Sequence, residues 1–115
     1  MPSSLWGRLW VALREGVFFF MGRREVYAVE GRSMWPTLEP GDRVFIDPER
    51  RGEIGDIVVA ELMTGRKVVK RITSKGTASV ALGSDNPAEA TDSRELGSLP
   101  LSNVKGQVVM TWPWR

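Results

Sequence analysis

Short apolar runs separated by turns rich in glycine, proline and aspartate limit what this chain can fold into. Short runs rich in β-branched and aromatic residues and bounded by such turns are typical of strands. The expected strands cover residues 25–30, 43–47, 57–62, 66–73, 77–82 and 104–112. The segment 83–100 is polar and turn-rich. Six strands with one N-terminal helix predict a mainly β fold, a small antiparallel β-barrel or folded sheet.

The segment before the first expected strand, residues 5–21, is apolar but is interrupted by Arg8, Arg14 and Glu15. A membrane-spanning helix needs about 20 predominantly apolar residues, so we do not expect this segment to span a bilayer. Its apolar residues recur at helical spacing, which predicts an amphipathic helix. Two interpretations stay open: the helix lies on a membrane surface or guides a substrate, or it packs on the barrel.

Length and composition narrow the class of protein. A chain of 115 residues supports one domain, so we expect residues 1–24 to form a helix and hinge and residues 25–115 a single β domain. A net charge of +2 gives no reason to expect a nucleic-acid partner. The absence of cysteine and histidine excludes disulfides, thiolate metal sites and any Ser/His/Asp triad. Proteolysis by this chain would therefore need a serine with a lysine, or paired carboxylates.

A lysine occupies the apolar face of one expected strand. With the two-residue period of a strand, Lys70 shares a face with Val68 and Ile72. The other face carries Lys67, Val69, Arg71 and Thr73. Burial disfavours the ammonium form and lowers the pKa of a lysine by up to ~3–5 units, which would make the amine a usable base at neutral pH. The alternative is an edge strand from which Lys70 reaches water while its stem covers the valines.

A serine follows the first expected strand in the sequence Gly-Arg-Ser-Met-Trp-Pro-Thr-Leu, residues 31–38. Pro36 and Pro40 restrict the backbone after Ser33, and a Gly-Asp turn at residues 41–42 follows. A loop stiffened in this way can hold the hydroxyl in one orientation. Taken alone, the loop is better explained as a surface turn that carries an ordinary hydroxyl.

Ser33 in this loop and Lys70 in Val-Val-Lys-Arg-Ile together resemble the signal peptidase I-like family of serine proteases. A third match is the segment 85–97, which is similar to the family's late G-D-N, S-x-D-S-R and G motifs, and Gly-Asp turns at 41–42 and 55–56 also fit. Several motifs in the right order are a more specific signal than any one of them. The run Ser-Asp-Asn-Pro-Ala-Glu-Ala-Thr-Asp-Ser-Arg looks most like nickel-type superoxide dismutase maturation proteases, which remove an N-terminal propeptide.

The resemblance implies a serine endopeptidase in which Ser33 is the nucleophile, Lys70 is the general base, and the backbone N–H of Ser33 meets the oxyanion. It implies a protein or peptide substrate, a propeptide-bearing precursor, and neither a cofactor, a metal nor a nucleic acid. We expect a cytoplasmic protein or one at the membrane surface, with peripheral membrane contact through residues 5–21.

The resemblance also assigns secondary roles. The residues expected to line a cleft for small substrate side chains are Val29, Met34, Leu38, Val68 and Val69. Those expected to support the site are Asp85, Asn86, Thr91, Asp92 and Arg94. Asp92 and Arg94 would form a bracing ion pair, although a solvated turn with ordinary charges accounts for them equally well.

The chain departs from the family pattern at three positions. Ser84 stands where the family has glycine, and Ala90 stands where it commonly has a serine that bonds the lysine. Thr91 is adjacent to Ala90 and could take over that role, but neighbouring residues usually face different ways. Gly31 replaces a hydroxyl residue that supplies a second oxyanion donor in some members.

Three other functions stay open. The chain could process exported proteins as a general signal peptidase does. It could resemble the self-cleaving domain of a repressor, which uses a similar Ser/Lys dyad, but no helix-turn-helix segment precedes it and no internal scissile loop is evident. It could also be a non-catalytic β-module that binds peptide or single-stranded nucleic acid through its tryptophans. The tryptophans in question are Trp6, Trp10, Trp35, Trp112 and Trp114.

Overall fold

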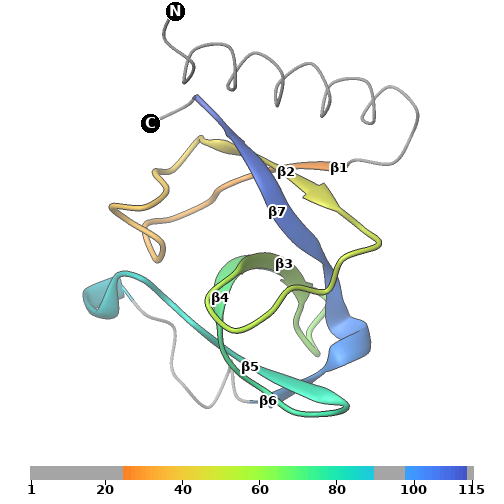
Figure 1. Cartoon of the computed structure of the whole chain (residues 1–115). Coiled ribbons are helices and arrows are strands. Elements are labelled where there is room, and N and C mark those ends of the chain that lie inside the picture. Colours follow the sequence, from red (N-terminus) through yellow and green to blue (C-terminus); the bar gives the residue numbers. More distant parts are fainter. Residues whose placement is uncertain (1–24, 90–97, 114–115) are drawn as a thin grey trace, which may run out of the picture.

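Seven strands of the described chain form one antiparallel sheet that curls into half a barrel (Figure 1). The computed structural model describes residues 25–89 and 98–113. In chain order the strands are β1 (Glu25–Ala28), β2 (Arg43–Asp47), β3 (Ile57–Glu61), β4 (Lys67–Lys75), β5 (Ser79–Gly83), β6 (Ser98–Pro100) and β7 (Val104–Trp112). Their order across the sheet is β1-β2-β7-β3-β4-β5-β6. The prediction of a mainly β, antiparallel fold is confirmed.

The positions of β2 and β7 agree with the predicted strands, whereas β6 was not predicted. β6 contributes a single buried side chain, Leu99, which pairs with Val80 of β5. A strand of three residues with one buried side chain is too short to produce a periodic signal, and its strand structure depends on pairing with β5. β4 also runs on to Lys75, because its polar end pairs with β5 beyond a bulge between Ile72 and Ser74.

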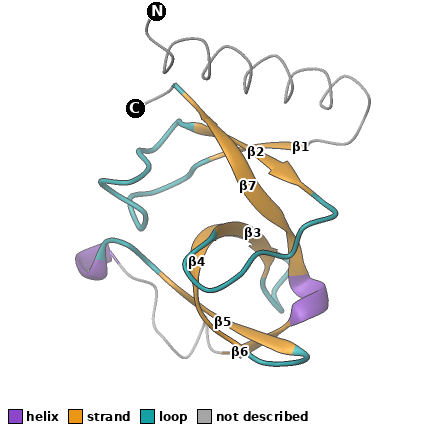
Figure 2. Cartoon of the chain, viewed as in Figure 1, coloured by secondary structure: helices purple, strands orange, loops and turns teal. Residues whose placement is uncertain are grey.

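Helices make up little of the described structure, as Figure 2 shows. Two short 3-10 turns cover Pro87–Glu89 and Leu101–Asn103. Among the described residues there is no helix with the length and apolarity needed to cross a bilayer. The predicted amphipathic helix at residues 5–21 and the hinge at 22–24 lie outside the described residues.

β3 separates two clusters of buried apolar side chains. Val58 belongs to the cluster formed mainly by β3 to β7, and Val59 belongs to the cluster that holds Val29, Met34 and Leu38. Consecutive residues of a strand point to opposite faces, so β3 is buried on both sides. This explains why its sequence is a continuous apolar run and does not alternate.

The two Gly-Asp turns have the same hydrogen bonding. The N–H of Glu39 donates to Asp42 Oδ2 and the N–H of Glu53 donates to Asp56 Oδ2, each at 2.8 Å. Beside the first turn, the N–H of Val29 donates to the carbonyl of Asp42 at 2.7 Å, which extends the β1–β2 ladder past the end of β1. This ladder holds the two ends of the intervening loop together, and that loop contains Ser33.

Candidate active site

Lys70 lies on the buried face of β4, as the alternation of this strand predicts. Its side chain is 2% exposed, and its neighbours two residues away, Val68 and Ile72, are buried with it. The alternative in which Lys70 extends from an edge strand into water is therefore wrong. The amine Nζ donates a hydrogen bond to the hydroxyl Oγ of Ser84 at 2.8 Å.

The register of β4 and β5 explains why Ser84 reaches Lys70. Arg71 pairs with Gly83, the last residue of β5. One more step in this antiparallel register brings Ser84 opposite Lys70, on the same face of the sheet. Ser84 also continues the alternation of Val80 and Leu82, both of which are buried. Its place opposite the lysine follows from strand geometry.

Asn86 holds the serine loop, residues 31–38, by two hydrogen bonds. Its side-chain Nδ2 donates to the carbonyl of Arg32 at 2.9 Å, and its backbone N–H donates to the carbonyl of Ser33 at 2.8 Å. The loop is anchored from below by the buried side chains of Met34 and Leu38. Backbone atoms on both sides of the nucleophile candidate are therefore fixed to the segment that follows β5.

Asp85 connects the serine loop to β4. Its carboxylate accepts two hydrogen bonds from Arg71, from Nε at 2.8 Å and from Nη2 at 2.6 Å, and a third from the hydroxyl of Thr37 at 2.6 Å. The hydrogen bonds from Arg71 lower the pKa of Asp85, and the same contact raises the pKa of Arg71. The pair therefore stays ionised at neutral pH. Arg71 also donates from Nη1 to the carbonyl of Gly55 at 2.7 Å.

Three consecutive residues, Ser84, Asp85 and Asn86, thus each make a different connection, and we call them the β5 extension. Ser84 contacts the lysine, Asp85 contacts the arginine beside it, and Asn86 contacts the backbone of the serine. The β5 extension therefore links β4, which carries Lys70, to the loop that carries Ser33.

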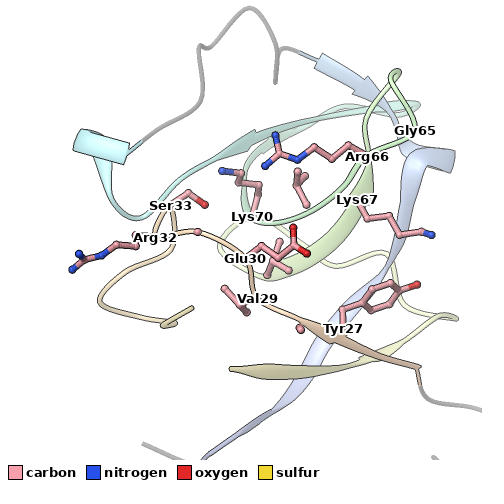
Figure 3. A pocket seen from close by; sticks show the side chains of 13 residues that line it. Tyr27, Val29, Glu30, Arg32, Ser33, Gly65, Arg66, Lys67 and Lys70 are labelled. Carbon is pink, nitrogen blue, oxygen red and sulfur yellow. The ribbon is translucent and has the colours of Figure 1, made fainter. Parts of the chain in front are cut away.

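A cleft of ≈ 530 Å³ opens between two segments, residues 27–33 and residues 65–70. Ser33 and Lys70 both line it, and Figure 3 shows the hydroxyl and the amine pointing toward one another from its two sides. Charged side chains also line the cleft: Glu30, Arg32, Arg66 and Lys67. A hydroxyl and an amine therefore line the same cleft.

Gly31 lies in the left-handed region with φ +70°. A side chain at this position would be strained, even though the surrounding space is open. The hydroxyl residue that the family pattern has here in some members would therefore be strained in this backbone. The turn into the serine loop accounts for the glycine in this chain.

The predicted site residues fall into three groups. The structure brings together Ser33, Lys70, Asp85 and Asn86, and Val29, Val68 and Val69 line the cleft. Met34 and Leu38, expected to line it as well, lie in the core cluster with Val29 and are not among the lining residues. Thr91, Asp92 and Arg94 lie outside the described residues, as does Ala90.

Sequence reasoning missed Ser84, Thr37 and Arg71 as members of this network. Ser84 had a signal, since it continues the alternation of Val80 and Leu82 toward the face of Lys70. Thr37 and Arg71 lie within the two motifs that carry the resemblance, but no local pattern joins them, because their link runs through Asp85, which is 48 residues from Thr37. In the part of the chain that the structure describes, no cluster of three His, Cys, Asp or Glu residues could hold a metal ion.

Comparison with known proteins gives the family of this chain. The chain belongs to the Peptidase S24-like family, which it matches over residues 12–105. It is also 41% identical over 66 residues to a signal peptidase I of Bacillus amyloliquefaciens, over 53% of this chain and 34% of that protein. The chain thus spans about a third of the length of this curated relative. The expected resemblance to a peptidase family is confirmed, and the nickel-type superoxide dismutase subgroup stays a prediction.

Proposed function

We propose that this protein is a serine endopeptidase with a Ser/Lys dyad. Ser33 Oγ attacks a peptide carbonyl carbon while Lys70 Nζ takes the hydroxyl proton. The lysine then gives that proton to the leaving amine, which breaks the C–N bond and leaves an acyl ester on Ser33. Water attacks the ester with Lys70 again as base, and Ser33 is regenerated. A positioned base of this kind contributes ~10²–10⁴-fold to the rate.

The observation that carries this proposal is the burial of Lys70 on the wall of a cleft shared with Ser33. Lysines are almost never fully buried unless they are paired, and burial favours the neutral amine that a general base requires. The hydrogen bond to the neutral hydroxyl of Ser84 is compatible with such an amine.

The oxyanion is assigned to the backbone N–H of Ser33. Within the described residues this N–H makes no backbone hydrogen bond, whereas the Ser33 carbonyl is fixed by Asn86. An amide held in place before reaction can stabilise the developing negative charge without reorganising. With Gly31 lacking a side chain, the second donor is proposed to be water.

The edges of the cleft favour an extended peptide as substrate. β1 is the outermost strand of the sheet. Because the backbone of Val29 is hydrogen-bonded on the β2 side, the backbone N–H and C=O groups of Ala28 and Glu30 point away from β2. On the opposite side of the cleft, the backbone N–H of Ile72 donates to the carbonyl of Asp56 on the β3 side. The backbone N–H and C=O groups of Lys67 and Val69, which alternate with those of Ile72, therefore point away from β3. β5 pairs with β4 only from Arg71 onward. A peptide strand could therefore bond to both edges, with small side chains against the valines.

The proposed substrate is a precursor that loses an N-terminal propeptide, in particular a nickel-type superoxide dismutase precursor. This finer assignment is supported by the resemblance of residues 84–94 described above. We also propose that the protein is cytoplasmic or lies at a membrane surface.

The test is incubation of the full chain with this precursor, followed by mass spectrometry of the new N-terminus. Wild type should cleave at one bond, and Ser33→Ala and Lys70→Met should each lose more than about 99% of the rate. An exported precursor with a signal peptide, tested in parallel, distinguishes general signal-peptidase-like processing. Equal cleavage by wild type and Ser33→Ala would exclude the dyad, and binding of peptide without cleavage by any variant would favour a non-catalytic module.

A further inference from the structure

Ser84 departs from the family pattern, and its side chain contacts the lysine of the proposed dyad. Its hydroxyl lies 2.8 Å from Lys70 Nζ, half-buried at the end of β5. The family pattern has a glycine here and places a serine at the position of Ala90, which has no hydroxyl to offer. Ser84 therefore supplies the hydrogen bond to the lysine for which Ala90 has no hydroxyl.

We propose that Ser84 is a positioning residue of Lys70, and that its Oγ accepts an N–H of the amine so that the lone pair is directed to Ser33. This inference rests on the proposed function. The donor direction is the essential point, because an amine has one lone pair. If Ser84 donated its proton to that lone pair, Lys70 could not accept the proton of Ser33.

The backbone fixes this geometry without help from a flexible loop. Ser84 is opposite Lys70 in the register of β4 and β5, and the next two residues are bonded to Arg71, Thr37 and the serine loop. The backbone position of Ser84 is therefore fixed, and its hydroxyl can move only by rotation about the Cα–Cβ bond. A group held in this way can restrict the rotation of a long lysine side chain.

Replacing Ser84 by alanine removes a hydroxyl but no charge, so the charged side chains around Lys70 stay the same. Those lining the cleft are Glu30, Arg32, Arg66 and Lys67, and the Arg71–Asp85 pair lies on the neighbouring residues of β4 and the β5 extension. A hydrogen-bond acceptor stabilises the ammonium form, so its removal should lower the pKa of Lys70. A shift of this sign would report the contact itself.

The experiment compares wild type with Ser84→Ala and Ser84→Thr by two measurements. Ser84→Ala should lower kcat about tenfold and move the acid limb of the pH–rate profile to lower pH, with KM nearly unchanged. Ser84→Thr keeps a hydroxyl and should restore most of kcat and the position of the limb. An unchanged kcat and limb in Ser84→Ala would overturn the proposal, as would loss of kcat in both variants without movement of the limb.

A second measurement does not depend on cleavage. In protein labelled with carbon-13 at the lysine ε-carbon, the shift of Lys70 is titrated in a Ser33→Ala background, with Lys67, Lys75 and Lys105 as internal references and Lys70→Met for assignment. The pKa of Lys70 should fall when Ser84→Ala is added and return with Ser84→Thr. If no peptide is cleaved, the proposed function fails while this titration still tests the contact. If cleavage is normal and the titration is unmoved, the Ser84 proposal alone fails.

Discussion

Replacement of Asp85 by alanine should destabilise the protein and slow cleavage together. The carboxylate holds Arg71 by two hydrogen bonds and Thr37 by a third. Hydrogen bonds to charged groups contribute about 1.5–3 kcal/mol each when buried, but the Arg71 side chain is 34% exposed and solvent screening reduces this. We therefore expect a loss of about 2–3 kcal/mol in the free energy of unfolding, or about 10 °C in Tm.

A matched control is Glu53→Ala, which removes a carboxylate from the ion pair with Lys75 while that glutamate is 81% exposed. This variant should lose at most about 1 kcal/mol. Thermal unfolding by circular dichroism measures the stability loss, and a peptide-cleavage assay measures kcat. The kcat should fall about tenfold in Asp85→Ala only, because the serine loop loses its link to β4. Equal stability losses in the two variants would refute the reasoning that this link is structural.

The same pair predicts a pH dependence of stability. Arg71 lowers the pKa of Asp85 in the folded protein below its value in the unfolded chain, roughly 3.9. The contribution is therefore fully present above that unfolded pKa and disappears as the pH falls through the lower folded pKa. The difference in unfolding free energy between wild type and Asp85→Ala should be constant from about pH 7 to 5 and shrink on further acidification. A difference that grows toward low pH would contradict the lowered pKa.

Three further changes test other contacts. Asn86→Ala should lower kcat about tenfold by releasing the Arg32 carbonyl, whereas Asn103→Ala, which loses a similar bond to the carbonyl of Glu61, should leave kcat unchanged. Ala28→Pro should raise KM up to about tenfold, because it removes a backbone N–H that faces the cleft, whereas Ala28→Ser keeps this N–H and should not raise KM. Equal KM values in the two variants would argue against strand pairing by the substrate. Lys70→Met should raise Tm while abolishing cleavage, since a buried amine gives way to an apolar side chain of similar length; a lower Tm would mean that the amine stabilises the fold.

Strand positions and buried faces could largely be predicted from local pattern. β4 shows why, since the alternation of Val68, Lys70 and Ile72 fixes which side chains enter the core. β6 could not be predicted, because its single buried leucine acquires strand structure only by pairing with β5. Periodicity describes a strand by itself, whereas pairing depends on a partner elsewhere in the chain.

The candidate site divides in the same way. Ser33, Lys70, Asp85 and Asn86 could be named from motifs, but the partners of Asp85 could not, because Thr37 is 48 residues away in the sequence. Ser84 stands out in the sequence as a deviation from a family pattern and as the next residue in the alternation of Val80 and Leu82. Its meaning depends on the register of β4 and β5, which a single sequence does not specify.

The bulge between Ile72 and Ser74 determines which side chain meets the amine. A slip of one residue in this pairing would bring Gly83 or Asp85 opposite Lys70 in place of the hydroxyl. Glycine would leave the amine without this acceptor, and aspartate would hold it as an ammonium ion, which could not take up the proton of Ser33 in the proposed mechanism. A single irregular step in this ladder thus decides whether the buried amine meets a neutral hydroxyl or a carboxylate.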